Sequence, residues 1–271
     1  MLKKLINESL ENSIYEKESV ALLFSGGVDS LTCLFSLLEI GIKPSLYTFY
    51  LEGKPNNDLY YSEKVASIFN LKHNVIMIPY DIEQLENHVK YIVSSLPVDR
   101  KTNVQCVFPF LYLLPEIKEQ YVVTGLCADD LYGSTKGVAI KGSKNKSVFD
   151  KIREKSRNNP NASAYLPIKT LVEDDHNKTL VAPYRDKNVF DYFMSKSWSE
   201  LNKPKQKQVA IDVYSKYFNA HDIYRRNSSL QVESGIREYH NELINSQLNR
   251  NNRKRVDEIY KDLQKELRGQ N

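Results

Sequence analysis

A short run of small and acidic residues, Ser25-Gly26-Gly27-Val28-Asp29-Ser30, directly follows an apolar segment at residues 19–24. Glycines let a backbone turn sharply and present its N–H groups without obstruction by a Cβ atom. A helical apolar pattern begins at Val28, so these N–H groups would lie at a helix N-terminus, where the helix dipole favours an anion. The run therefore predicts a phosphate-binding loop, with backbone and hydroxyl donors from Ser25, Gly26, Gly27 and Ser30.

Asp29 is the residue of this loop that a phosphate chain would repel. A carboxylate beside phosphate is accommodated when a cation bridges the two, and Mg²⁺ prefers oxygen ligands of both kinds. Asp29 therefore predicts a magnesium ion that accompanies the phosphates. A tight turn with an Asp near a helix start is the plainer alternative.

The segments around the loop alternate between strand and helix patterns. Strand patterns cover residues 19–24, 45–51, 74–78 and 121–124, and helix patterns cover residues 28–40, 59–69, 81–94 and 104–117, the last with a kink or break at Pro109. Alternating strands and helices predict an open parallel α/β sheet with flanking helices. Such sheets bind ligands beyond the carboxyl ends of their strands, which is where the predicted loop lies.

The pattern changes after about residue 135, which divides the chain into three parts. Residues 1–135 are predicted to form the α/β domain, and residues 136–162, rich in Lys, Ser, Asn and Gly, a mobile and irregular basic loop. Residues 163–271 are predicted to be mainly helical, with helices at 189–194, 206–218 and 232–267, and to complete the site.

Composition excludes several classes of protein. The 271 residues are 41% hydrophobic and 27% charged, as in ordinary soluble proteins. No apolar run approaches the roughly 20 residues that cross a bilayer, and no signal peptide is recognisable. Three scattered cysteines argue against a disulfide framework or a structural zinc site. We therefore expect a cytoplasmic protein without a membrane partner. A net charge of +4 does not by itself imply nucleic acid.

The loop resembles the PP-loop of the N-type ATP pyrophosphatases and lacks the Gly-x-x-x-x-Gly-Lys pattern of Walker loops. A second segment, residues 124–133 (TGLCADDLYG), resembles the Gly-x-Gly-Ala-Asp-Glu-Leu-Phe-Gly segment of asparagine synthetases and their β-lactam-forming relatives. The resemblance covers residues 15–220 and implies an adenine nucleotide α-hydrolase-like fold. It also implies that ATP is cleaved between its α and β phosphates. It implies that Asp129 is a second magnesium ligand beside Asp29. For Asp130 two roles stay open, a magnesium ligand or a helix N-cap.

Further site residues follow from the same resemblance. Residues 182–186 resemble the Arg-x-Pro-Phe-Leu-Asp segment of that family, which places a lysine nearby to stabilise charge on the α-phosphate. Lys205 is our first choice for that lysine and Lys203 and Lys207 are the alternatives, although a solvated lysine run is an equally simple interpretation. The backbone near Leu23 and Leu51 would hold adenine, with Gly125 near the ribose.

The sequence departs from the asparagine synthetase pattern where that family handles ammonia. Leu126 stands where the family carries a Glu, Cys127 replaces a Gly, and Val181 replaces the Arg of Arg-x-Pro-Phe-Leu-Asp. No glutaminase domain precedes the match, so any ammonia would need a separate source. Because an apolar Leu cannot accept a proton, we expect an amine larger than ammonia.

The sequence thus predicts an asparagine-synthetase-like enzyme that uses ATP to adenylate a small-molecule carboxylate, releases pyrophosphate and forms an amide with an amine. Two alternatives stay open. One is a PP-loop enzyme that adenylates a base or nucleotide in nucleic-acid modification, which the basic stretches at 136–157 and 250–268 favour. The other is a nucleotide-binding module without catalysis.

Overall fold

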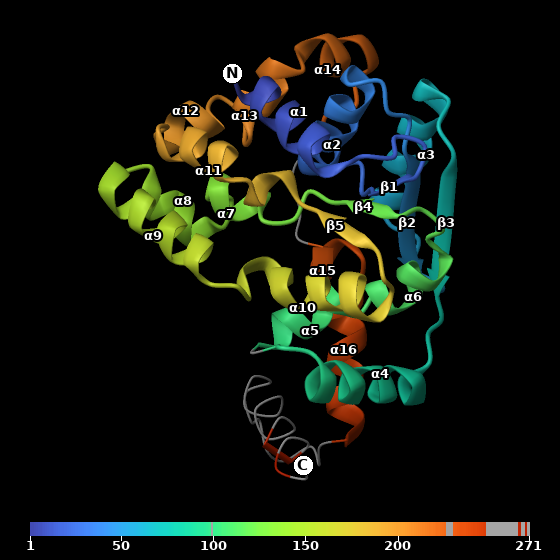
Figure 1. Ribbon diagram of the computed structural model, residues 1–271. Coiled ribbons are helices and arrows are strands. Elements are labelled where there is room, and N and C mark those ends of the chain that lie inside the picture. The colour runs from blue at the N-terminus through green and yellow to red at the C-terminus, as the bar shows by residue number, and fades with distance from the viewer. Residues whose placement is uncertain (99, 226–229, 248–264, 267–268, 270–271) are drawn as a thin grey trace.

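A five-stranded sheet forms the centre of the computed structural model, which describes residues 1–98, 100–225, 230–247, 265–266 and 269 (Figure 1). All the strand pairs are parallel, and the order across the sheet is β3-β2-β1-β4-β5. The strands are β1 (Val20–Leu23), β2 (Ser45–Leu51), β3 (His73–Ile78), β4 (Tyr121–Val123) and β5 (Thr179–Val181). The predicted open parallel sheet is confirmed.

Successive strand residues point to opposite faces, and both faces are covered. Val20 and Leu22 belong to one buried apolar cluster, whereas Ala21 belongs to the other. In β4, Val122 faces the second cluster between Tyr121 and Val123, which face the first. Burial on both faces explains why these strands are continuous apolar runs and do not alternate with polar residues.

The first face is covered by helices from both ends of the chain. They are α1 (Leu2–Ser13), α2 (Val28–Glu39), α3 (Asn57–Phe69), α7 (Ala128–Tyr132), α11 (Lys187–Met194), α12 (Trp198–Asn202), α13 (Gln208–Val213) and α14 (Ser215–His221). The N-terminal helix α1 contacts α2, α11 and α13. Sequence patterns did not predict α1.

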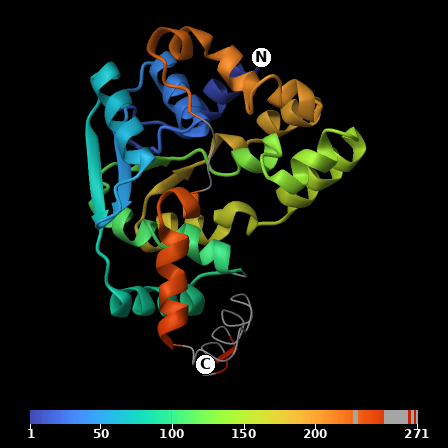
Figure 2. The ribbon, with the colours of Figure 1, turned by 180° about the vertical axis from the view of Figure 1, so that it is seen from behind.

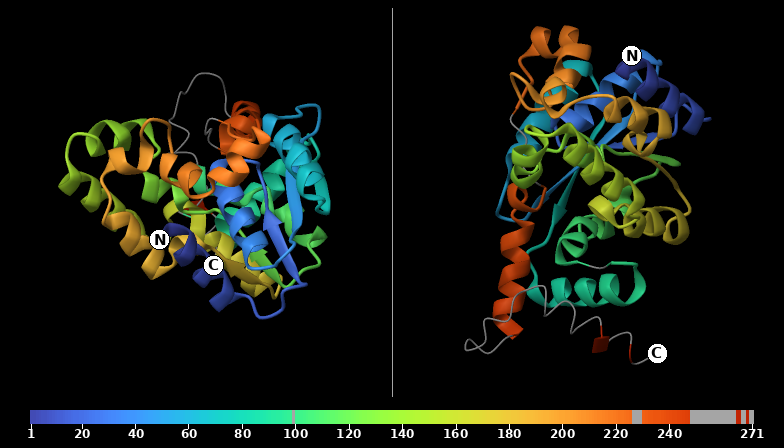
Figure 3. Two further views of the ribbon diagram at one scale, coloured as in Figure 1. Left: turned by 90° about the horizontal axis from the view of Figure 1, so that it is seen from above. Right: turned by 90° about the vertical axis from the view of Figure 1, so that its left-hand side faces the viewer.

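The second face is covered by α4 (Ile82–Ser95), α5 (Lys101–Val107), α6 (Phe110–Leu113), α10 (Tyr165–Thr170) and α16 (Ile236–Gln247). The break between α5 and α6 at Pro109 is the one that the sequence predicted. Figures 2 and 3 show α16 beside α4 at the end of the molecule away from α1, and the two helices are in contact.

Residues 136–162 are not the irregular loop that their composition predicted. They form α8 (Lys136–Gly142) and α9 (Lys146–Asn158), which lie to one side of the sheet (Figure 1). The Asn145 side chain caps α9 by accepting a hydrogen bond from Val148 N at 3.2 Å. Phe149 is fully buried, and the Arg153 guanidinium lies 3.9 Å from the centre of its ring. A cap and one buried anchor therefore order a segment whose other residues are mostly polar. Its mobility stays a prediction.

Two further boundaries differ from the predicted ones. Strand β5 at Thr179–Val181 joins the sheet, so the α/β part extends beyond residue 135. The predicted helix at 232–267 is interrupted at Gly235, whose φ of +74° separates α15 (Leu230–Glu233) from α16. Most of the predicted basic helix at 250–268 lies outside the described residues. No helix in the described ranges is long and apolar enough to cross a bilayer.

We expect Gly133→Ala to lower the free energy of unfolding by about 2–4 kcal/mol, from overpacking together with a left-handed backbone. Gly133 has a φ of +64°, and a Cβ atom there would lie 2.5 Å from Phe149 Cε2. Gly137→Ala is the matched control, because a Cβ there meets nothing within 4 Å. Urea unfolding measures both variants, and equal midpoints for the two would contradict the packing assigned to Gly133.

We also expect the protein to lose stability below pH 6.5 through His240. This side chain is fully buried on α16 against the Phe108 ring, and burial lowers its pKa to about 3. The folded pKa lies below the unfolded value of about 6.5. The full stability of the folded state is therefore present above pH 6.5, and it is lost as the pH falls and the unfolded chain takes up a proton at His240. Between pH 7 and 5 the wild type should lose about 2 kcal/mol more than His240→Gln in urea unfolding. An equal loss in both proteins would contradict this.

Candidate active site

The order of the strands fixes where the candidate site lies. From β1 the chain continues to β2 on one side, whereas β4 pairs with β1 on the other, which makes a topological switch point at their carboxyl ends. The Ser25–Ser30 loop follows β1, and the turn containing Asp129 follows β4. A Cβ atom at Gly125 would lie 2.9 Å from Asp29 Cβ, so only glycine allows the two segments to approach this closely.

The loop folds on itself in a way that exposes backbone donors. Gly26 has a φ of +70°, and a Cβ there would lie 2.8 Å from Tyr61 Cβ. Ser25 Oγ accepts from Gly27 N at 3.3 Å, and Ser30 Oγ donates to Gly27 O at 3.0 Å. Gly27 is the N-cap of α2, and no side chain of the described residues caps this helix. N–H groups in the first turn of a helix have no partner within the helix, so this loop fits an anion.

Lys207 connects the two segments. Its Nζ lies 2.5 Å from Asp29 Oδ2 and 2.7 Å from Asp129 Oδ1, and its side chain is fully buried. Lys203 and Lys205 are exposed, and Lys205 Nζ lies 5.0 Å from the centre of the Tyr224 ring. The structure therefore brings Lys207 to the predicted aspartates, and Lys205, the first choice from the sequence, lies elsewhere.

Side-chain to backbone hydrogen bonds hold the Lys207 segment on the end of α7. Asn202 Nδ2 donates to Tyr132 O at 2.8 Å, while Asn202 Oδ1 accepts from Lys207 N at 3.1 Å. Gln206 Nε2 donates to Ser134 O at 3.3 Å. Lys207 itself has a φ of +61° and is the N-cap of α13. These contacts direct its side chain inward, and short-range sequence patterns carry no sign of them.

The electrostatics of the three groups are coupled. Burial raises the pKa of Asp29 to about 6, Lys207 opposes the rise, and Asp129 adds to it. Burial alone would lower the pKa of Lys207, but Asp29 and Asp129 raise it above its ordinary value, so Lys207 carries its charge. Asp29 Oδ1 is buried and has no hydrogen-bond partner among the described residues. One oxygen of Asp29 is thus left for another ligand.

The two aspartates fit a magnesium ion that arrives together with phosphate. Within the described ranges, no group of three or more His, Cys, Asp or Glu side chains could form a site by itself. Mg²⁺ usually takes one or two carboxylates and completes its shell with water and substrate phosphates. Asp29 and Asp129 would supply these two carboxylates. Asp29 has a buried oxygen without a partner among the described residues, and 46% of the Asp129 side chain is exposed. The metal role stays a prediction.

The other predicted residues lie at the same edge of the sheet but have different partners. Leu23 ends β1, and the carbonyl of the buried Leu51 accepts from Lys54 N at 2.8 Å. Asp130 has a different partner, Ser163, whose Oγ donates to Asp130 Oδ2 at 2.8 Å. The adenine and ribose contacts stay predictions. Cys127, where the resembled family has Gly, adopts a φ of +69°, which accounts for glycine at that position.

Arg225 is a neighbour of the loop that the sequence did not reveal. Its Nη2 donates to Ser25 O at 2.9 Å across a separation of 200 residues. It belongs to no motif, and the arginine pair at 225–226 carries no distinctive pattern.

Comparison with known proteins gives a match to one family model and several similar solved structures. The family model described as asparagine synthase matches residues 1–270. Similar solved structures include a predicted subunit of tRNA methyltransferase from Methanocaldococcus jannaschii (15% identity, 78% of this chain and 94% of that chain, TM-score 0.37). A second is U34-tRNA thiolase NcsA from Methanococcus maripaludis (13% identity, 94% of this chain and 83% of that chain, TM-score 0.39). A third is NMN synthetase from Francisella tularensis (14% identity, 84% of this chain and 94% of that chain, TM-score 0.34). Because the family model spans nearly the whole chain, the protein belongs to the asparagine synthase family.

Proposed function

We propose that the protein adenylates a substrate carboxylate with ATP, releases pyrophosphate and transfers the acyl group to an amine. The observation that carries this proposal is the buried ammonium of Lys207 between Asp29 and Asp129, beside the phosphate-binding loop. Family membership supports the use of ATP. The substrate carboxylate would attack the α-phosphorus, the bond to the β-phosphate would break, and pyrophosphate would leave.

Charge balance indicates how the site receives a triphosphate. Two carboxylates against one ammonium leave the empty cluster with a net negative charge, which opposes an anionic nucleotide. Bound Mg²⁺ would be held by Asp29 and Asp129 and would neutralise charge on the phosphates. Lys207 would then be released to pair with phosphate oxygens whose charge increases in the transition state. A donor aimed at such an oxygen is worth about 3 kcal/mol in comparable sites.

The two side chains at the positions that the resemblance connects with amine handling are apolar. Leu126 packs against both apolar clusters, and Cys127 is buried next to it. Neither side chain offers a charged partner that would compensate a small hydrated nucleophile for the loss of its water. These two residues favour an amine that brings its own apolar bulk.

A second candidate, adenylation of a base or nucleotide in a nucleic acid, is favoured by one observation. Helices α8 and α9 and the turn between them carry exposed lysines at positions 141, 144, 151 and 155. A basic projection beside the site could hold a polyanionic backbone.

We predict that Lys207→Met lowers pyrophosphate release from Mg-ATP at least about 100-fold, because it removes a charge aimed at the reacting phosphate. Lys205→Met, a change of the exposed neighbour, should stay within about twofold of the wild type. Release is measured with a panel of carboxylic acids and amines, and thermal melting shows whether each variant is folded. Near-normal release by folded Lys207→Met protein would contradict the assignment.

We predict further that aspartate with ammonium chloride is a poor substrate pair. The apolar surface of Leu126 and Cys127 should make AMP formation faster with larger amines. Total tRNA is included in the same AMP assay to test the second candidate. Efficient asparagine production would show that the protein is an ordinary asparagine synthetase, and AMP formation only with RNA would favour the second candidate.

A further inference from the structure

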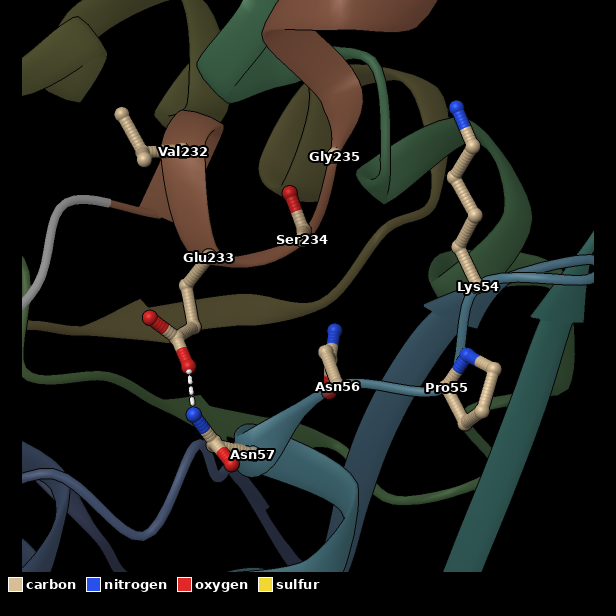
Figure 4. A pocket seen from close by; sticks show the side chains of 8 residues that line it. All are labelled: Lys54, Pro55, Asn56, Asn57, Val232, Glu233, Ser234 and Gly235. Carbon is tan, nitrogen blue, oxygen red and sulfur yellow. Dashed lines mark hydrogen bonds between the residues drawn. The ribbon is translucent and has the colours of Figure 1, made fainter.

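Two pieces of chain near the C-terminus, residues 222–225 and 230–235, lie against the start of α3; we call them the strap. Asp222 O accepts from Lys64 Nζ at 3.0 Å, and Glu233 Oε1 accepts from Asn57 Nδ2 at 2.6 Å (Figure 4). Between residues 54–57 and the second piece of the strap lies a hollow of about 480 Å³. The strap thus contacts α3 at both its pieces and leaves open space beside Glu233.

Arg225 extends from the strap to the phosphate-binding loop. Its side chain is only 12% exposed. Nη2 bonds Ser25 O at 2.9 Å and would lie 3.8 Å from a Cβ atom placed on Gly27. The same nitrogen pairs with Asp58 of α3, and Nη1 lies 3.9 Å from Glu233 Oε1. The guanidinium is therefore in contact with the loop at the residues that are predicted to present N–H groups to phosphate.

The position of Arg225 is complementary to that of Lys207. Lys207 meets the loop from the β4 side, where it pairs with Asp129. Arg225 meets the loop from the β2 side, where it pairs with Asp58 at the start of the helix after β2. The loop, which follows the central β1, therefore has a cation on each side, the fully buried Lys207 and the mostly covered Arg225. The planar guanidinium matches phosphate oxygens in bidentate geometry, which an ammonium cannot do.

The partners of Arg225 suggest an exchange. Asp58 is buried, and burial raises its pKa although Arg225 opposes the rise, so desolvation makes the charged carboxylate costly. Arg225 Nε is buried without a hydrogen-bond partner among the described residues. The open hollow beside Glu233 provides space for that carboxylate to turn away. A phosphate group on the loop can therefore compete with Asp58 and Glu233 for the guanidinium.

We infer that Arg225 binds the pyrophosphate portion of the nucleotide from the β2 side and that Asp58 holds the guanidinium in place while the loop is empty. This inference rests on the proposed function, since it deepens the assignment of the same loop. It makes Arg225 a ligand of the leaving group, opposite the position of Lys207.

The inference is tested by calorimetric titration of the full chain with inorganic pyrophosphate and Mg²⁺, and separately with AMP. Arg225→Gln should weaken pyrophosphate binding at least tenfold and change AMP binding less than threefold. Lys64→Gln is the matched control, because it removes a contact of the strap with α3 and leaves the loop untouched, so both affinities should be unchanged. Equal weakening of both ligands by Arg225→Gln, or no weakening, would overturn the inference.

Asp58→Asn separates a phosphate ligand from a structural ion pair. If Arg225 only supports the fold, Asp58→Asn should reproduce the loss seen in Arg225→Gln. If Arg225 binds phosphate, releasing it from Asp58 should leave pyrophosphate affinity unchanged or make it tighter. The Asp58→Asn measurement stands by itself if Arg225→Gln fails to fold. A tenfold loss of pyrophosphate affinity in folded Asp58→Asn protein would overturn the inference.

Pyrophosphate binding does not require turnover, so the two proposals can fail separately. Arg225-dependent binding by a protein that forms AMP with none of the acids and amines would remove the amide-forming proposal and leave the inference standing. If the wild type forms AMP and Arg225→Gln binds pyrophosphate normally, the inference falls and the amide-forming proposal stands. Wild-type protein that binds no pyrophosphate would overturn both.

Discussion

The site depends on one contact, in which the buried ammonium of Lys207 pairs with the carboxylates of Asp29 and Asp129. It joins three segments that are far apart in the chain: the loop after β1, the turn after β4 and the start of α13. A buried charge that loses its partner costs several kcal/mol, so arrangements that separate these segments are strongly disfavoured. The same contact that orders the empty site therefore places the loop, Asp129 and the lysine within reach of one ligand.

In the proposed function, a nucleotide would have to reorganise this same contact. The raised pKa of Asp29 shows that Lys207 does not fully offset the desolvation of that carboxylate. A divalent cation can supply the missing positive charge, and phosphate can replace the carboxylates around the ammonium. Binding then exchanges one set of charged contacts for another without exposing apolar surface. Arg225 and Asp58 repeat this arrangement on the other side of the loop, again with a cation paired to a carboxylate, although Arg225 is 12% exposed.

The parts of the structure that the sequence predicted are those determined by neighbouring residues. Strands β1 and β4 are continuous apolar runs, and the two glycines after β1 mark the loop. Strand β5 has three residues, and only its pairing with β4 makes it a strand. Residues 136–162 looked irregular because one buried aromatic, Phe149, anchors an otherwise polar helix. The three lysines at 203–207 are chemically equivalent in sequence, and long-range bonds through Asn202 and Gln206 decide which one turns inward.

The departures from the asparagine synthetase pattern can be placed relative to the charged cluster. Leu126 contributes to both apolar clusters, and Val181 is buried at the end of β5, so each has become part of the core. Neither changes a partner of Lys207. The adjacent acid, Asp130, is held by Ser163. In the proposed function, the chain keeps the groups that would act on the triphosphate and carries packing residues at two positions where the resembled family has charged ones. Since these replaced positions offer no base, a nucleophile at this site would have to arrive neutral or lose its proton to another group.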